Sequence, residues 1–222
     1  MLGNLVKTLG IRSRVGCISF YRNFSGTIGL GCDIPGHSLD DIMKTELLKD
    51  ATPEQITKVW TEYHQKKDGF VSAVIPSLHY AEIEAKGRVC PRFVYAIPKD
   101  NGGFEMMYSE IHQHRISFTS LEAFKALQSS APPLLELFHY VDFQKSKELV
   151  LMRGAFKDPL TSTEAVFLVN QLQMYYRIDP ERYKLVHTFN HNPMFFDFNE
   201  LLKNLDSPDL KAPSHTTQNT LT

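Results

Sequence analysis

The chain has 222 residues, 24 Lys and Arg, 25 Asp and Glu, and a net charge of −1. This balance provides neither a basic field for nucleic acid nor a polybasic patch for a membrane surface, so we expect no nucleic-acid binding and no membrane insertion. Cys17 and Cys32 lie in or beside a basic leader and leave Cys90 alone, which excludes a disulfide framework and a CxxC metal knuckle.

The first 32 residues contain four basic residues and no Asp or Glu. Wound into a helix, they place Leu2, Leu5, Val6 and Leu9 on one stripe. An amphipathic, arginine-containing and acid-free leader is typical of a mitochondrial transit peptide. Because Arg22 lies three residues before the Phe24/Ser25 bond, we expect cleavage there, with residues 1–24 as transit peptide and 25–37 as a linker. The alternative is a disordered basic tail with accidental periodicity.

Three helices are expected at the start of the mature chain. Ser38 and Asp41 have capping-box spacing, and the apolar stripe that follows predicts a helix through Leu47. Thr52-Pro53-Glu54-Gln55 begins a second helix, which carries Trp60 on its apolar stripe and closes at Gly69. A third, shorter helix is expected over residues 76–87.

The periodicity changes to that of strands between Pro91 and Phe156. The pattern predicts strands over residues 93–97, 104–111, 115–119, 134–143 and 148–152, with a small helix over 120–127. Asn101-Gly102-Gly103 is a strong turn signal between the first two of these strands, which form a hairpin. Since the connections are too short for crossovers, these strands must pair antiparallel.

The remaining elements are a long helix from Thr161, a last strand over residues 183–189 and a final helix capped by Asp197. Residues 207–222 have little to bury, and we expect them to be disordered. The predicted class is α+β: a mainly antiparallel sheet of about five or six strands packed with helices, as a single domain over residues 38–206.

Candidate chemical groups form no complete constellation in the sequence. His187 and His191 have a metal-binding spacing, but Pro193 and Asn190 argue against a helix there and no third ligand is in sight. His112 and His114 fit a solvated strand edge better than a chelating pair. No motif pairs Cys90 with the His or Asn that a nucleophilic cysteine needs, so we expect it to be a small buried apolar residue. We therefore expect no catalytic residue, no metal and no cofactor.

Several segments together resemble the ATP11 family of mitochondrial ATP synthase assembly factors. The resemblance spans residues 39–206. It rests on Ile42 to Leu48, Thr52 to Tyr63, Lys66 to Pro76, Pro91-Arg92-Phe93, Pro98-Lys99, Gly103-Phe104-Glu105, Val150-Leu151-Met152 and Thr188-Phe189-Asn190. No single motif is diagnostic, but their order and spacing are fairly specific. The chain departs from the family pattern at Phe104, where tyrosine is common, and at His187, which replaces an acidic residue.

The resemblance implies a chaperone in the mitochondrial matrix. We expect the protein to be a monomer. Members of this family are understood to bind the free β subunit of the catalytic sector of ATP synthase and to prevent its aggregation until an α subunit takes its place. A competing interpretation is a matrix enzyme or small-ligand-binding protein, whose pocket between sheet and helices would be lined by Tyr63, Tyr80, Tyr108, His139 and Tyr140. A third is a permanent subunit of a complex.

Loops at strand ends are where rigid scaffolds usually display contacts. The residues expected to bind the partner are therefore Phe104 and Glu105, beside the hairpin turn, and Thr188, Phe189 and Asn190, at the end of the last predicted strand. The structural alternative is that Phe189 belongs to the core and that Asn190 is a cap or turn residue.

Overall fold

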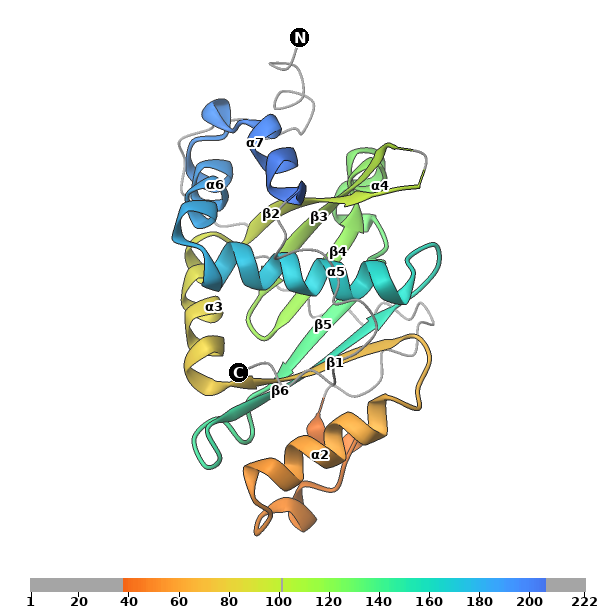
Figure 1. Ribbon diagram of the computed structural model, residues 1–222, viewed down its shortest axis with the longest axis vertical. Helices are drawn as coiled ribbons and strands as arrows, with labels where there is room; N and C mark the ends of the chain where they lie inside the picture. The colour runs from red at the N-terminus through yellow and green to blue at the C-terminus, as the bar shows by residue number, and fades with distance from the viewer. Residues whose placement is uncertain (1–37, 101, 207–222) are drawn as a thin grey trace.

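The computed structural model describes residues 38–100 and 102–206, so the predicted transit peptide, linker and disordered tail lie outside the described residues. A six-stranded antiparallel sheet carries helices on both faces (Figure 1), which confirms the predicted α+β class. None of the helices in these two ranges combines the length and the apolar content needed to cross a membrane.

The sheet has the strand order β1-β6-β5-β4-β3-β2, and every neighbouring pair is antiparallel. Its strands are β1 (Phe70–Pro76), β2 (Arg92–Pro98), β3 (Phe104–His112), β4 (Arg115–Ser120), β5 (Leu135–Tyr140) and β6 (Leu149–Phe156). Only helix α3 (Ser77–Val89) separates β1 from β2 in the chain. These two strands nevertheless form opposite edges, so α3 carries the chain from one edge of the sheet to the other.

The main face of the sheet is covered by α3, α5 (Ser162–Gln173), the π-helical turn η4 (Met174–Ile178), α6 (Pro180–His191) and α7 (Phe198–Lys203). Its core is rich in aromatic rings: Phe93 lies 5.2 Å from Tyr95 and 4.8 Å from Tyr175, between ring centroids. Gly154 allows close packing here, because a Cβ at that position would lie 2.6 Å from side-chain atoms of Leu137 and Val71.

The second face is covered at two separate places. Helix α2 (Pro53–His64) packs on β6, where fully buried Trp60 donates a hydrogen bond from Nε1 to the Met152 carbonyl oxygen at 3.3 Å. Helix α4 (Leu121–Leu127) packs on β3, and Phe124 stacks on Tyr108 at 4.0 Å. Successive side chains of each strand point to opposite faces of the sheet. They form a large core on one face and smaller apolar clusters on the other.

The predicted strand over residues 183–189 is wrong, because this segment forms helix α6. Asp179 caps the helix by accepting hydrogen bonds from the N–H groups of Glu181 and Arg182, and Pro180 occupies the first turn. These start signals outweigh the β-rich composition that favoured a strand. The expectation that Asn190 and Pro193 prevent a helix at His187 and His191 is also wrong, because both histidines lie in α6.

Two further segments differ from expectation. The first predicted helix is a pair of 3-10 turns, Leu39–Asp41 and Thr45–Leu48, although the capping box at Ser38 is confirmed. Strand β1 had no predicted element, because it is a short apolar run between two helices. Such a run cannot be separated from a connection or a helix end by periodicity alone.

The other predicted elements are confirmed with shifted ends. Both hairpins form, β2 with β3 and β5 with β6, and the capping boxes at Thr52 and Thr161 begin α2 and α5. Asp197 caps α7 as expected. Local signals of this kind were sufficient because each depends only on residues a few positions apart.

Replacing Trp60 by alanine should remove the centre of the α2 cluster. We expect Trp60→Ala to lower the free energy of unfolding by about 3–5 kcal/mol, since the ring is fully buried and leaves a cavity. Val59, its neighbour on α2, is 45% exposed, so Val59→Ala should change stability by no more than about 0.5 kcal/mol. Denaturant titration measures both, and equal losses would contradict the placement of Trp60.

An ion-pair network joins the β2–β3 hairpin to the start of α5. Lys99 Nζ donates to Glu164 and lies 2.7 Å from Glu105 Oε2, while the Thr161 N–H donates to Glu164 at 2.8 Å. The hydrogen bonds to Glu105 and Glu164 raise the pKa of Lys99. Burial by itself would raise the pKa of Glu164, but the bonds from Lys99 and Thr161 outweigh it and lower that pKa.

Stability from this network should depend on pH with a definite sign. Because the pKa of Glu164 is lowered in the folded chain, its contribution is present above the unfolded pKa of about 4.3 and is lost as the pH falls through the folded value. We expect Glu164→Gln to cost about 1 kcal/mol at pH 7 and little at the acid end of the titration. Glu62→Gln is the control, since the exposed Lys58–Glu62 pair spans 3.9 Å. A loss at pH 7 that persists unchanged in acid would contradict this role.

Candidate partner-binding surface

Phe104 and Glu105 follow the hairpin turn, as the sequence predicts. Gly102 has a φ of +77°, and its N–H donates to the Lys99 carbonyl at 3.0 Å, which brings the two strands together. The Phe104 ring is 49% exposed, whereas the Glu105 carboxylate is held by Lys99. The hairpin therefore presents an aromatic ring to solvent on a base that is fixed by an ion pair.

Thr188, Phe189 and Asn190 lie in the last turns of α6 and not at a strand end. Phe189 is buried, with its ring 5.7 Å from Phe93 and 5.1 Å from Phe196. The Asn190 side chain accepts from the Arg92 N–H at 3.2 Å and donates to the Arg92 carbonyl at 2.6 Å. Phe189 therefore belongs to the core, as the structural alternative stated. Asn190 bonds α6 to the edge strand β2.

Thr188 is half-buried and lines a groove of about 420 Å³ between α6 and α7. The same groove is lined by Phe195, which belongs to the short turn η5 (Pro193–Phe195). Met194 and Phe195 on this turn are 85% and 81% exposed. Sequence reasoning missed them; the signal was a Met-Phe pair directly after Asn192-Pro193, where a polar loop would be ordinary.

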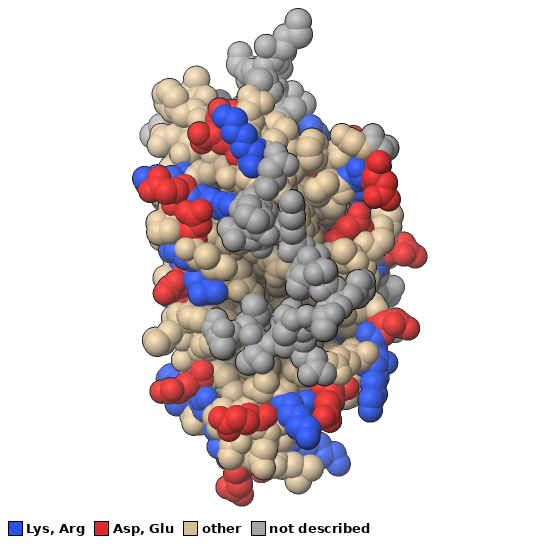
Figure 2. Space-filling view, viewed as in Figure 1, with Lys and Arg blue, Asp and Glu red and all other residues tan. Residues whose placement is uncertain are grey.

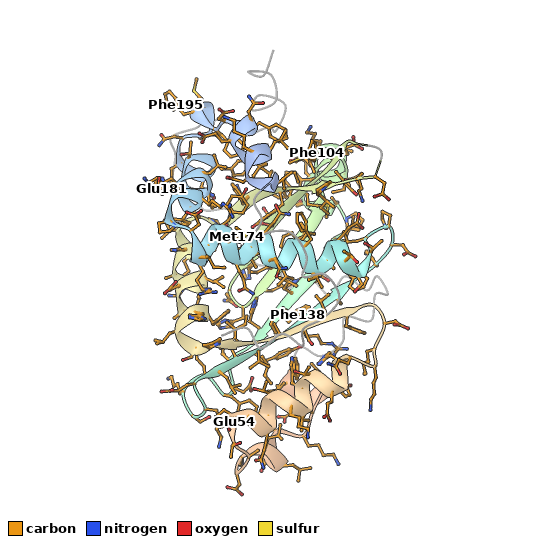
Figure 3. All side chains as sticks on the ribbon, in the orientation of Figure 1. Glu54, Phe104, Phe138, Met174, Glu181 and Phe195 are labelled. Carbon is orange, nitrogen blue, oxygen red and sulfur yellow. The ribbon has the colours of Figure 1, made fainter. Side chains whose placement is uncertain are left out.

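Phe195 and Phe104 lie at the same end of the molecule, on either side of α7 in the view of Figure 3. We call the set formed by Phe104, Thr188, Met194 and Phe195 the apolar end. Basic and acidic side chains are interspersed over the visible face in Figure 2, so no single-sign patch dominates there. Exposed aromatic and methionine side chains with a mixed-charge rim are a composition suited to protein contact.

The pocket expected in the enzyme interpretation is not formed by its five candidate residues. Tyr80 and His139 stack at 4.9 Å on the main face, whereas Tyr108 and Tyr140 point to the second face and contact Phe124 and Trp60. Burial lowers the pKa of His139 to about 4. Because Tyr80 and Tyr108 lie on opposite faces of the sheet, the five side chains do not line one pocket, although His139 and Tyr140 share a hollow of about 450 Å³ at the end of β5.

Cys90 and His191 come together although they are far apart in the sequence. The Cys90 Sγ lies 3.6 Å from His191 Nε2, and the Tyr183 hydroxyl donates to the same sulfur at 3.4 Å. Burial raises the pKa of the Cys90 thiol, which disfavours the thiolate that a nucleophile needs. The pairing depends on α6 packing beside the start of β2, so sequence spacing could not reveal it.

The histidines of the two candidate chelating pairs lie on α6 and around the β3–β4 turn. The His187 and His191 rings on α6 lie 4.4 Å apart between centroids, tilted by 41°, and His114 Nδ1 lies 2.7 Å from the Tyr80 hydroxyl. Across residues 38–100 and 102–206, no three His, Cys, Asp or Glu side chains gather in a way that could hold a metal ion.

Comparison with known proteins places the chain in a family. The model of the ATP11 protein family matches residues 33–202. ATP synthase mitochondrial F1 complex assembly factor 1 of Danio rerio is 34% identical over 183 residues, which cover 82% of this chain and 60% of that protein. The Homo sapiens protein of the same name is 32% identical, with coverage of 82% and 56%.

A more distant relative is protein atp11, mitochondrial, of Schizosaccharomyces pombe, which is 25% identical over 76% of this chain and 62% of its own length. The chain thus spans less than two thirds of the length of these curated relatives. Because the family model covers most of the described domain and two vertebrate relatives exceed 30% identity, the chain belongs to the ATP11 protein family.

Proposed function

We propose that this chain is a non-catalytic assembly chaperone of mitochondrial ATP synthase. The observation that carries the proposal is family membership together with the name of its relatives, ATP synthase mitochondrial F1 complex assembly factor 1. Its client is the free β subunit of the catalytic sector, which it holds soluble until an α subunit replaces it. The resemblance of residues 39–206 to the family motivates this choice of client.

The chemistry of such a role agrees with the described domain. An unassembled subunit exposes an apolar interface that drives aggregation, and a partner can cover it by complementary shape alone. The apolar end offers exposed Phe104, Met194 and Phe195 on a rigid base for this contact. Exchange for the α subunit requires the chaperone complex to be weaker than the final one.

The site of action in this proposal is the mitochondrial matrix, after removal of residues 1–24. The acid-free leader and Arg22 three residues before the cleaved bond motivate it. Peptide mass analysis of the protein from isolated mitochondria should find an N-terminus at Ser25. An intact Met1 in that fraction, or protein found solely in the cytosol, would overturn the targeting proposal.

A pull-down with purified subunits tests the client. We expect the chain to recover the free β subunit, and excess α subunit to abolish that recovery, because α occupies the same surface with higher affinity. Soluble β subunit incubated without the chain should aggregate faster, as measured by light scattering. Equal recovery of assembled F1 complex and free β subunit would refute a placeholder that is displaced on assembly.

The contribution of the apolar end is testable with charge substitutions at exposed positions. We expect Phe195→Asp and Phe104→Asp each to weaken β binding about tenfold, because a central aromatic anchor contributes at least 1–2 kcal/mol. Both side chains are exposed, so melting temperatures should change little. Leu78→Asp on α3 is the matched control, since Leu78 is 78% exposed away from this end. If the control weakens binding as much as Phe195→Asp, the apolar end is not the contact surface.

A further inference from the structure

Within the part of the chain that the structure describes, the outer side of strand β1 has main-chain groups without partners. β1 pairs only with β6, and the bonds from Ser77 N–H to the Glu148 carbonyl and from Phe156 N–H to the Gly69 carbonyl set which residues face β6. By the alternation of an antiparallel ladder, Phe70, Ser72 and Val74 direct their N–H and C=O groups away from β6. Among the described residues, no group bonds to the outward main chain of Ser72 or Val74.

The opposite edge of the sheet is partly closed by side chains from the helices. On β2 the outward positions are Arg92, Val94 and Ala96, by the same alternation. Asn190 bonds both the N–H and the carbonyl of Arg92, and Gln171 Nε2 donates to the Ala96 carbonyl at 3.1 Å. Within residues 38–100 and 102–206, two amide side chains thus bond to the outward main chain of β2 at Arg92 and Ala96, and none bonds to that of β1 at Ser72 or Val74.

The open edge lies at the bottom of a groove. Figure 1 shows β1 between α2 and α5, and a hollow of about 530 Å³ runs along it. Thr57 and Thr61 of α2 line one wall, and Val166, Val169 and Asn170 of α5 line the other. β1 residues whose side chains point to either face of the sheet line this space. The groove therefore follows the edge of the sheet and not one of its faces.

The groove is uncharged over most of its length. β1 has no charged residue, although exposed edges are commonly protected by lysine, by a bulge or by inward charges. The charged residues that line the groove are Lys147 and Glu148, which lie at the end of β1 marked by Pro76. A segment that matches this charge distribution is neutral in its middle, extended, and apolar at the alternate positions that face Val166 and Val169.

We propose that β1 binds a neutral, extended segment of the protein client as a seventh strand of the sheet. This inference deepens the proposed function and rests on it: the client is the unassembled β subunit, and the groove is where its main chain is held. Main-chain pairing supplies affinity that depends little on sequence, while the two helix walls select small and apolar side chains. A second copy of this chain fits less well, because pairing of two β1 edges would bring both sets of α2 and α5 against each other.

A proline substitution tests the main-chain bond directly. Ser72→Pro deletes an outward N–H that β6 does not use, and an edge strand tolerates proline at such a position. We expect it to weaken binding of purified β subunit about tenfold, as measured by fluorescence titration. Ser72→Ala is the matched control: it removes the same hydroxyl but keeps the N–H, and its affinity should equal that of the unaltered chain.

A second variant avoids any change to the strand. Val166 is 41% exposed on the groove wall, so Val166→Lys should leave folding intact and weaken β binding by placing a charge beside the bound segment. Val59→Lys is its control, because Val59 on α2 is exposed to a similar extent, 45%, but does not line the groove. Hydrogen–deuterium exchange of the full chain should show that saturating β subunit slows exchange of the amides of residues 70–74.

The outcomes separate this inference from the proposed function. If the unaltered chain binds β subunit while both groove variants bind equally well and residues 70–74 keep their exchange rate, the edge is not the site and the chaperone function stands. If the unaltered chain binds no β subunit, both proposals fail. A dimer of the free chain that Ser72→Pro dissociates would assign the edge to a second copy, and faster exchange of residues 70–74 on deletion of residues 207–222 would assign it to this chain itself. Either result overturns the inference.

Discussion

The crossing of α3 from β1 to β2 is the constraint on which the other features of this fold depend. Because strands that are consecutive in the chain become opposite edges, the remaining four strands must fill the sheet between them as antiparallel hairpins. Both edges then expose main-chain groups that need partners. The C-terminal helices return over the main face to β2 and supply Asn190 and Gln171, whereas no such element reaches the outer side of β1 among the described residues.

Burial on the two faces follows from the same arrangement. The main face carries interlocked aromatic rings around Phe93 and Tyr95, and the close approach at Gly154 lets β1, β5 and β6 pack tightly beneath the helices. On the second face, α2 depends on the Trp60 cluster for its attachment. Since α2 forms one wall of the groove, loss of Trp60 would disturb the groove as well as the stability of the fold.

The candidate surfaces lie on segments that ion pairs, helix caps or strand pairing hold in place. Phe104 stands on a hairpin whose base is joined to α5 by Lys99 and Glu164, and Phe195 stands on a turn between two capped helices. β1 is fixed along its whole length by β6. Preformed surfaces of this kind lower the ordering cost of binding.

The sequence by itself determined those parts of the protein that depend on neighbouring residues. Capping boxes at Ser38, Thr52 and Thr161 predicted where segments begin, the Gly102 turn predicted the first hairpin, and the order of short segments indicated the ATP11 family. Phe104 was also placed correctly beside the turn.

Tertiary structure decided the rest, because the relevant partners are distant in the chain. Residues 183–189 are helical and pack Phe189 on Phe93, Cys90 meets His191, and exposed Met194 and Phe195 become an end surface beside α7. The local sequence pattern likewise cannot predict whether the outward main-chain groups of an edge strand are hydrogen-bonded. That depends on which side chains the completed fold brings to the strand.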